Sequence, residues 1–179
     1  AVVNACRGGH LGCLRLLHTF HADLTVNATI AAAYNGHLDC LTYLHSQNCD
    51  WWEVTTDAAA ELGHLHCLRY AVEHGCSLSE EVVRLAARFG SLPCVQYLVE
   101  ECHQPISIAA FGDAFARAHV DCVKYIIDRT NSVSWYTYDH DQYIETLFAL
   151  PTSPYLRPQF DRNFLECIQY AVKFGWKWD

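Results

Sequence analysis

The sequence contains no methionine, only five prolines and nine glycines among 179 residues, and no long apolar run. Low proline and glycine contents, together with 51% hydrophobic residues, argue against a disordered chain and predict a folded one with ample core material. Because no apolar stretch approaches the roughly 18 residues of a membrane span, we expect no membrane insertion. The first residues also lack the positive charge that opens a secretory signal peptide. Since methionine is absent and the chain opens inside a repeat, we expect it to be a fragment of a longer protein.

Basic residues are also scarce, with 12 Lys and Arg against 20 Asp and Glu and a net charge of −8. Binding to nucleic acid or to an anionic membrane requires clustered cations, so we expect neither partner. The sequence lacks a glycine-rich phosphate loop and a serine nucleophile elbow, and no cysteine-protease signature surrounds Cys102-His103. These absences predict a non-enzymatic protein without a cofactor.

Cysteine, by contrast, is abundant: the chain has ten, and six of them occupy one position of an internal repeat. Cys13, Cys40, Cys67 and Cys94 follow one another in equal steps of 27, and the step is then 28 to Cys122 and 45 to Cys167. The pattern is clearest in residues 35–52, where Gly-His-Leu-Asp-Cys-Leu stands at 36–41. A period in the twenties is typical of stacked supersecondary units rather than of one globular core.

Each unit is predicted to contain two helices. Around Leu38, Leu41 and Leu44 apolar residues recur at helical spacing, which predicts a second helix with one apolar face. A tyrosine recurs three residues after the cysteine in five units and predicts a stacked aromatic column whose hydroxyls reach solvent. The first helix carries a repeated alanine, which lets neighbouring helices approach closely, and a glycine then turns the chain into the second helix. The alanines are Ala5, Ala32, Ala59, Ala86 and Ala114, and the glycines are Gly9, Gly36, Gly63 and Gly90.

Helix ends are predicted from capping residues. Asp50 and Ser77 stand three residues before Glu53 and Glu80, which is capping-box spacing, and Pro105 suits a first helical position. We therefore expect the first helices to begin at these residues. We expect the second helices to end eight residues after each repeated cysteine, at a residue with a left-handed conformation, which Gly and Asn adopt readily. The residues at this position are His21, Asn48, Gly75 and Cys102.

The repeated cysteines are expected to be free thiols. Equivalent residues of a stacked array lie about 10 Å apart, whereas a disulfide needs α-carbons within about 7 Å. Reduced thiols favour an intracellular compartment, cytoplasmic or nuclear. Pairs such as His37 and Cys40 put two zinc-type ligands one helical turn apart, but the repeat persists where Ser91 or Phe164 replaces the histidine, which favours a structural role. Asp139-His140-Asp141 is similarly interpreted as a solvated patch.

The pattern Ala-Ala-x-x-Gly-His-Leu-x-x-Leu-x-x-Leu-x-x-x-x-Cys at 32–49 resembles the second half of an ankyrin repeat. The resemblance covers about residues 4–130 and again 164–179. It departs from the family in lacking the Thr-Pro-Leu-His opening and in a period about 6 residues short of the usual 33. It implies an all-α, ankyrin-like solenoid of stacked helix pairs with β-hairpin fingers reduced or absent. The short units look like the compact ankyrin arrays of giant viruses and some protists.

The whole chain is predicted to form a single repeat domain. Its last step, from Cys122 to Cys167, is much longer than the step before it, which indicates an insertion near 135–160, and three prolines between 151 and 158 place a loop there. Insertions in solenoids map to one edge and are often functional. The expected units are about 1–22, 23–49, 50–76, 77–103, 104–131 and 132–179.

The resemblance also implies that a partner binds the concave face lined by the first helices. The exposed positions there are expected to be Ala31, Tyr34 and Asn35, then Ala58, Glu61 and Leu62, then Leu85, Arg88 and Phe89. These positions differ between units while the scaffold positions repeat, so they are free to specify a partner, and they include residue types enriched in hot spots. The alternative is that they are ordinary solvent-facing residues.

We therefore predict a monomeric interaction module, an adaptor or scaffold, that binds a protein or peptide. Glu61 and Arg88, on neighbouring units about 10 Å apart, suit a mixed apolar and charged peptide. Two alternatives stay open: a purely architectural array, and a repeat protein that senses metal or oxidant through Cys and His. The candidate binding residues are Tyr34, Asn35, Trp52, Glu61, Leu62, Arg88, Phe89 and Trp135.

Overall fold

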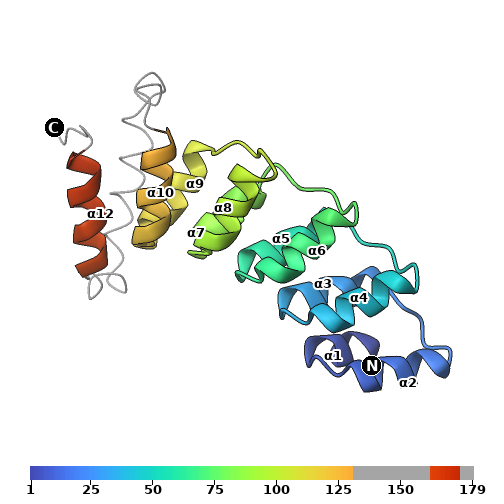
Figure 1. Cartoon of the computed structure of the whole chain (residues 1–179). Coiled ribbons are helices and arrows are strands. Elements are labelled where there is room, and N and C mark those ends of the chain that lie inside the picture. Colours follow the sequence, from blue (N-terminus) through green and yellow to red (C-terminus); the bar gives the residue numbers. More distant parts are fainter. Residues whose placement is uncertain (131–161, 174–179) are drawn as a thin grey trace.

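The computed structural model describes residues 1–130 and 162–173, so Trp135, the polar patch at 139–141 and the expected insertion lie outside the described residues. Within the described ranges the chain forms helices and no strand, and the helices follow one another as stacked pairs in a curved row (Figure 1). The predicted all-α array of helix pairs is confirmed. The helices are α1 (Val2–Arg7), α2 (Leu11–Thr19), α3 (Val26–Tyr34), α4 (Leu38–Ser46), α5 (Glu53–Glu61), α6 (Leu65–Glu73), α7 (Val82–Arg88), α8 (Leu92–Glu100), α9 (Ile108–Ala116), α10 (Val120–Thr130) and α12 (Arg162–Lys173).

The first helices α1, α3, α5, α7 and α9 form one side of the array. Their repeated alanines are buried: Ala32, Ala59, Ala86 and Ala114 are 0% exposed. Such small side chains let neighbouring first helices approach closely. The first helices accordingly pack on one another more extensively than the second helices do. The array therefore bends toward the row of first helices, which makes that side concave.

The second helices supply most of the larger core side chains. Leu41, Leu68, Val95 and Val123, each directly after the repeated cysteine, are 0% exposed. The cysteines of these helices are buried as well, whereas Cys13 is exposed because α2 belongs to the unit at the end of the stack. All ten cysteines are free thiols. None of the helices among the described residues is both long and apolar enough to cross a membrane.

The Gly-His sequence that joins the two helices connects neighbouring units. Gly36 has a positive φ of 73°, and a Cβ on it would lie 2.6 Å from Nδ1 of His64 in the next unit. In the same way Nε2 of His37 donates a hydrogen bond to the carbonyl of Arg7, at 3.1 Å. The ring of each such histidine therefore lies against the glycine of the preceding unit. This interlocking contact explains why glycine and histidine recur together.

The recurring tyrosines also connect units, rather than simply exposing their hydroxyls. The Tyr43 hydroxyl lies 2.9 Å from Nδ1 of His18, and the Tyr70 hydroxyl lies 3.1 Å from Nδ1 of His45. Each tyrosine thus binds a side chain on the second helix of the preceding unit. The Tyr125 hydroxyl likewise donates a hydrogen bond to Oε1 of Glu100 in the preceding unit, at 3.1 Å. At Tyr43, Tyr70 and Tyr125 the predicted tyrosine column is therefore a set of hydrogen bonds between neighbouring units, whereas Tyr97, 6% exposed, is part of the core.

The expected starts of the first helices were wrong. Helix α5 begins after Trp52 and α7 after Glu81, and neither Asp50 nor Ser77 caps a helix. The chain between units is instead non-helical where it passes the preceding first helix, and the Thr56 hydroxyl donates to the Ser77 carbonyl there at 2.8 Å. Helix α9 likewise begins later than expected, at Ile108, three residues beyond Pro105. Ser107 caps it, and the Ser107 side chain accepts a hydrogen bond from the Ala110 amide.

The left-handed residues after the second helices largely follow the prediction. His21, Asn48 and Gly75 have φ values of 60°, 56° and 86°. In the fourth unit the positive φ of 56° falls on His103 and not on Cys102. The reason is that α8 is followed by a residue, Glu101, that still has helical dihedral angles.

Candidate functional site

Three of the candidate binding residues lie at the C-terminal ends of consecutive first helices. Tyr34 is the last residue of α3, and Leu62 and Phe89 directly follow α5 and α7. Although each side chain is large and apolar, the three are 41%, 40% and 40% exposed. Tyr34, Leu62 and Phe89, one per unit, thus form a series along the first-helix side of the array, called the apolar row below.

The expectation that Ala31 and Ala58 share this surface was wrong. They are 8% and 5% exposed and belong to the core between the helices. Each lies one helical turn before the C-terminal residue of its helix, where the neighbouring units cover it. Of the apolar residues expected on this surface, the exposed ones are therefore those at the last residue of a first helix or directly after it.

Glu61 and Arg88 hold equivalent positions in neighbouring units, beside the apolar row. The carbonyl of Glu61 accepts a hydrogen bond from Oγ of Ser91 at 3.3 Å, and the carbonyl of Arg88 accepts one from Nε2 of His119 at 3.0 Å. The next unit thus holds the backbone of both residues. Their side chains, of opposite charge, are presented from fixed positions.

The remaining candidates are not part of this group. Asn35 donates a side-chain hydrogen bond to the carbonyl of Ala31 at 2.8 Å, so its amide closes the end of α3. Trp52 is 61% exposed but precedes α5, a helix of 9 residues and about 13 Å, so it lies at the end opposite Leu62. Trp135 lies outside the described residues.

Phe89 is flanked by two guanidinium groups. Cζ of Arg88 lies 5.9 Å and Cζ of Arg117 5.5 Å from the centroid of its ring, distances that permit cation–π attraction. Arg117 follows α9, so the two arginines come from adjacent units. Nε of Arg88 is buried and has no hydrogen-bond partner among the residues that the structure describes.

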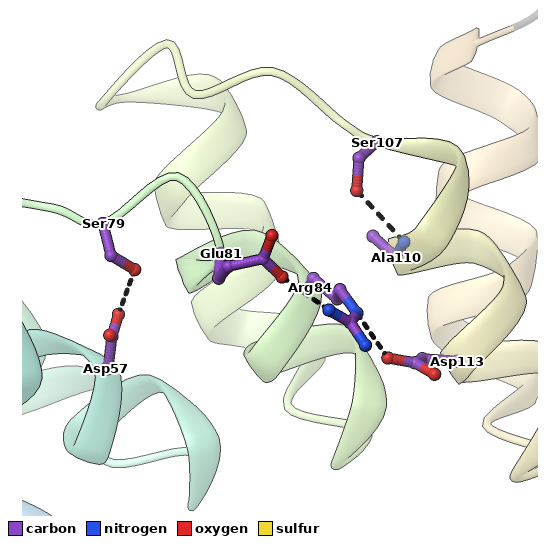
Figure 2. A network of polar contacts seen from close by, with 7 residues as sticks. All are labelled: Asp57, Ser79, Glu81, Arg84, Ser107, Ala110 and Asp113. Atoms are coloured by element: carbon purple, nitrogen blue, oxygen red, sulfur yellow. Dashed lines mark hydrogen bonds and ion pairs between the residues drawn. The ribbon is translucent and has the colours of Figure 1, made fainter.

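A second set of polar contacts connects α5, α7 and α9 (Figure 2). Ser79 donates to Asp57 at 2.6 Å. Arg84 donates to Glu81 at 2.7 Å and to Asp113 at 2.8 Å, which ties α7 to α9. These side chains satisfy one another and therefore act as connections between units rather than as a free binding surface.

Asp57 is half-buried, and that burial is the main reason its pKa is raised above the usual value. The hydrogen bond from Ser79 lowers the pKa, whereas the carboxylates of Glu53, Glu61 and Glu81 raise it further. Glu53, Asp57 and Glu61 are four residues apart and share one face of α5. This part of the concave side is consequently acidic.

The His-x-x-Cys pairs do not converge into a metal-binding group in the structure. His37 and His119 are hydrogen-bonded to carbonyls of the preceding unit, and Cys40 and Cys122 are buried in the core. Among residues 1–130 and 162–173 no three His, Cys, Asp or Glu side chains are placed to hold one metal ion. Burial also raises the pKa of Cys122 to about 12, which disfavours its thiolate form.

An aromatic cluster beside α4 and α6 contains two neighbouring histidines, His45 on α4 and His74 directly after α6. The ring of His45 stacks on Trp51 with centroids 4.2 Å apart and meets His74 edge-on at 5.2 Å. Burial, followed by the charge of His74, lowers the pKa of His45. The cluster contains no catalytic pair with a nucleophile, and its evident effect is on packing between the units.

Residues 30–110 match the sequence family Ankyrin repeats (3 copies). These residues contain ankyrin repeats. The crystal structure of the human ASB11 ankyrin repeat domain is similar, with a TM-score of 0.73 and 19% identity, over 99% of this chain and 84% of that chain. At this identity the likeness shows that the fold is an ankyrin array, including the units outside the family match. No curated protein matches the chain by sequence.

Sequence reasoning missed one residue of this ankyrin surface, Arg117. It stands as far after Phe89 as Cys122 stands after Cys94, so it is the fifth unit's equivalent of Phe89. Carrying the alignment across that longer step would have found it. The contact of its guanidinium with Phe89 required the structure.

Proposed function

We propose that this ankyrin array is a non-enzymatic interaction module that binds a peptide or protein segment across the apolar row. Ankyrin repeats in general are protein-interaction modules. The observation that carries the proposal is the exposure of about 40% at each of Tyr34, Leu62 and Phe89, in three consecutive units. Tyr34 and Phe89 are aromatic, and Phe89 lies beside Arg88. Aromatic residues and arginine are among the residue types enriched in protein interfaces.

The use of the other repeated positions supports this assignment. The alanines, the cysteines after the first unit, and the Gly-His pairs are buried or engaged with neighbouring units. At the ends of the first helices the residue type instead changes from unit to unit, from Tyr34-Asn35 to Glu61-Leu62 and Arg88-Phe89. Residues not needed for stacking are available to select a partner.

The alternative of a cysteine-based oxidant sensor is less well supported. Burial raises the pKa of Cys67 to about 12 and that of Cys94 to about 11, whereas reactive thiols have lowered pKa values. Ten free thiols agree with an intracellular, reducing compartment, which we include in the proposal together with a monomeric state.

The test is selection from a random library of displayed 12-residue peptides, followed by calorimetry with synthetic copies of the selected peptides. The variant Leu62→Ala/Phe89→Ala removes two members of the apolar row. Its matched control is Leu16→Ala/Phe20→Ala, which removes a leucine and a phenylalanine that are 58% and 74% exposed at the end of the stack.

We expect the row variant to bind the selected peptides at least tenfold more weakly and the control variant to bind within twofold of the wild type. Surface substitutions typically change stability by less than about 0.5 kcal/mol, and circular dichroism checks that both variants remain folded. Peptides that bind the row variant normally, or a library that yields no binder, would overturn the proposal.

A further inference from the structure

The strongest unassigned feature of the concave side is the pair of arginines around Phe89. The two guanidinium groups lie 5.9 Å and 5.5 Å from the centroid of one ring, and that phenylalanine is 40% exposed. They come from adjacent units, Arg88 at the end of α7 and Arg117 just after α9. Two like charges held at one aromatic ring repel each other, and an anion between them would relieve that repulsion.

Neither arginine has an anionic partner within the described part of the chain. Arg84, on the same helix as Arg88, binds Glu81 and Asp113 (Figure 2), and Arg129 pairs with Glu100. No described carboxylate lies within ion-pair distance of Arg88 or Arg117, although acidic residues outnumber basic ones by 20 to 12. Their guanidinium groups are therefore available to a partner.

The side chain of Arg88 is also incompletely satisfied. Its Nε is buried and makes no hydrogen bond to any residue of the described ranges. Because an unsatisfied buried donor is destabilising, rotation of this side chain toward an external acceptor is favourable. A carboxylate suits a guanidinium because its two oxygens accept two parallel N–H bonds.

We propose that Arg88, Arg117 and Phe89 form a subsite for a carboxylate side chain, Asp or Glu, of the segment bound on the apolar row. The inference rests on the proposed function and adds the chemistry of its partner. A carboxylate is favoured over a phosphate group because the chain carries a net charge of −8, which repels a dianion more strongly than a monoanion.

The repeat spacing also fixes where the carboxylate lies relative to an apolar anchor. Leu62 belongs to the unit next to that of Phe89, about 10 Å away by the spacing of packed helices. An extended peptide advances about 3.3 Å per residue. The bound peptide therefore carries an acidic residue at the arginine subsite and, about three positions before or after it, an apolar residue that contacts Leu62.

The experiment uses the peptides selected from the displayed library on the wild-type chain. Arg88→Gln/Arg117→Gln removes both charges and keeps polar side chains of similar reach. Arg15→Gln is the control, because Cζ of Arg15 also lies over an aromatic ring, that of Tyr43 at 5.4 Å, and Arg15 has no ion pair in the described residues. Each peptide is also made with its acidic residue replaced by Ala and by phosphoserine.

We expect selected peptides to carry an acidic residue about three positions from an apolar one. Replacing that acid with Ala, or both arginines with Gln, should each weaken binding at least tenfold, and combining the changes should cost little more than either alone. The Arg15 variant should bind within twofold of the wild type, and phosphoserine should bind no more tightly than Glu.

Peptides without an acidic preference, or equal binding by the Arg88→Gln/Arg117→Gln variant, would overturn the subsite. If such peptides still lose affinity with Leu62→Ala/Phe89→Ala, the proposed function stands and only the carboxylate subsite fails. Tenfold tighter binding of phosphoserine would overturn the carboxylate assignment in favour of a phosphate site.

Discussion

The contact between glycine and histidine of adjacent units allows a graded test of what holds the array together. Gly36→Ala places a residue with a Cβ at a φ of 73°, and that Cβ would lie 2.6 Å from Nδ1 of His64. His64 must then move, which disturbs its hydrogen bond to the backbone of Tyr34. Gly75→Ala is the matched control, because its φ of 86° is equally left-handed but no atom lies within 4 Å of the added Cβ.

The two substitutions separate the backbone cost from the contact cost. A left-handed conformation costs an alanine about 1–2 kcal/mol, and both variants share this term. Loss of a hydrogen bond adds about 0.5–1.5 kcal/mol in Gly36→Ala alone. We therefore expect Gly36→Ala to lower the free energy of unfolding by about 2–3 kcal/mol and Gly75→Ala by about 1–2 kcal/mol.

Urea unfolding followed by circular dichroism measures the difference. The variant His64→Ser reproduces the natural pair of Gly63 and Ser91, in which a Cβ on the glycine would lie 3.1 Å from the serine Oγ, and it provides a second background for Gly36→Ala. In a His64→Ser background the Gly36→Ala change should cost no more than Gly75→Ala does in the wild type. Equal destabilisation by Gly36→Ala and Gly75→Ala in the wild type would refute the interlocking role of His64.

Two further predictions concern titratable groups. In the native chain a thiol reagent should modify the exposed Cys13 first. Burial raises the pKa values of Cys67 and Cys122 to about 12, so the reagent should modify these two thiols only after unfolding. Early reaction of either thiol would contradict its burial. Burial and then His74 lower the pKa of His45, so the unfolded chain binds more protons below about pH 6.5 and stability falls on acidification through that range. The decrease in Tm from pH 7.5 to 5.5 should be smaller in His74→Gln than in the wild type, and an equal decrease would contradict the coupling.

Much of the scaffold follows from the sequence because each unit repeats the same packing requirement. The equal steps from Cys40 to Cys67 and from Cys67 to Cys94 predict equivalent positions, and all three thiols are 0% exposed. The alanine and glycine positions are predictable for the same reason, since close approach and a positive φ each restrict the residue type.

The starts of the first helices could not be predicted because the competing partner lies in the preceding unit. Capping-box spacing at Ser77 and Glu80 describes only local hydrogen bonds. In the structure the Ser77 carbonyl accepts a hydrogen bond from the Thr56 hydroxyl, on the first helix of the preceding unit. That contact keeps Ser77 outside the helix, so the helix begins later. A local capping pattern gives no information about a donor that belongs to another unit.

The candidate site shows the same division between local pattern and contacts that span units. Position in the repeat identifies Leu62 and Phe89 as unconstrained by stacking, and their exposure of 40% agrees with that prediction. Whether a charged neighbour is free depends instead on what the next unit supplies. Arg84 pairs with Asp113 of the following first helix, whereas Arg88, four residues later, lies at the ring of Phe89 together with a second arginine, Arg117. Of these two arginines on α7, Arg84 therefore connects neighbouring units, whereas Arg88 is available to a partner.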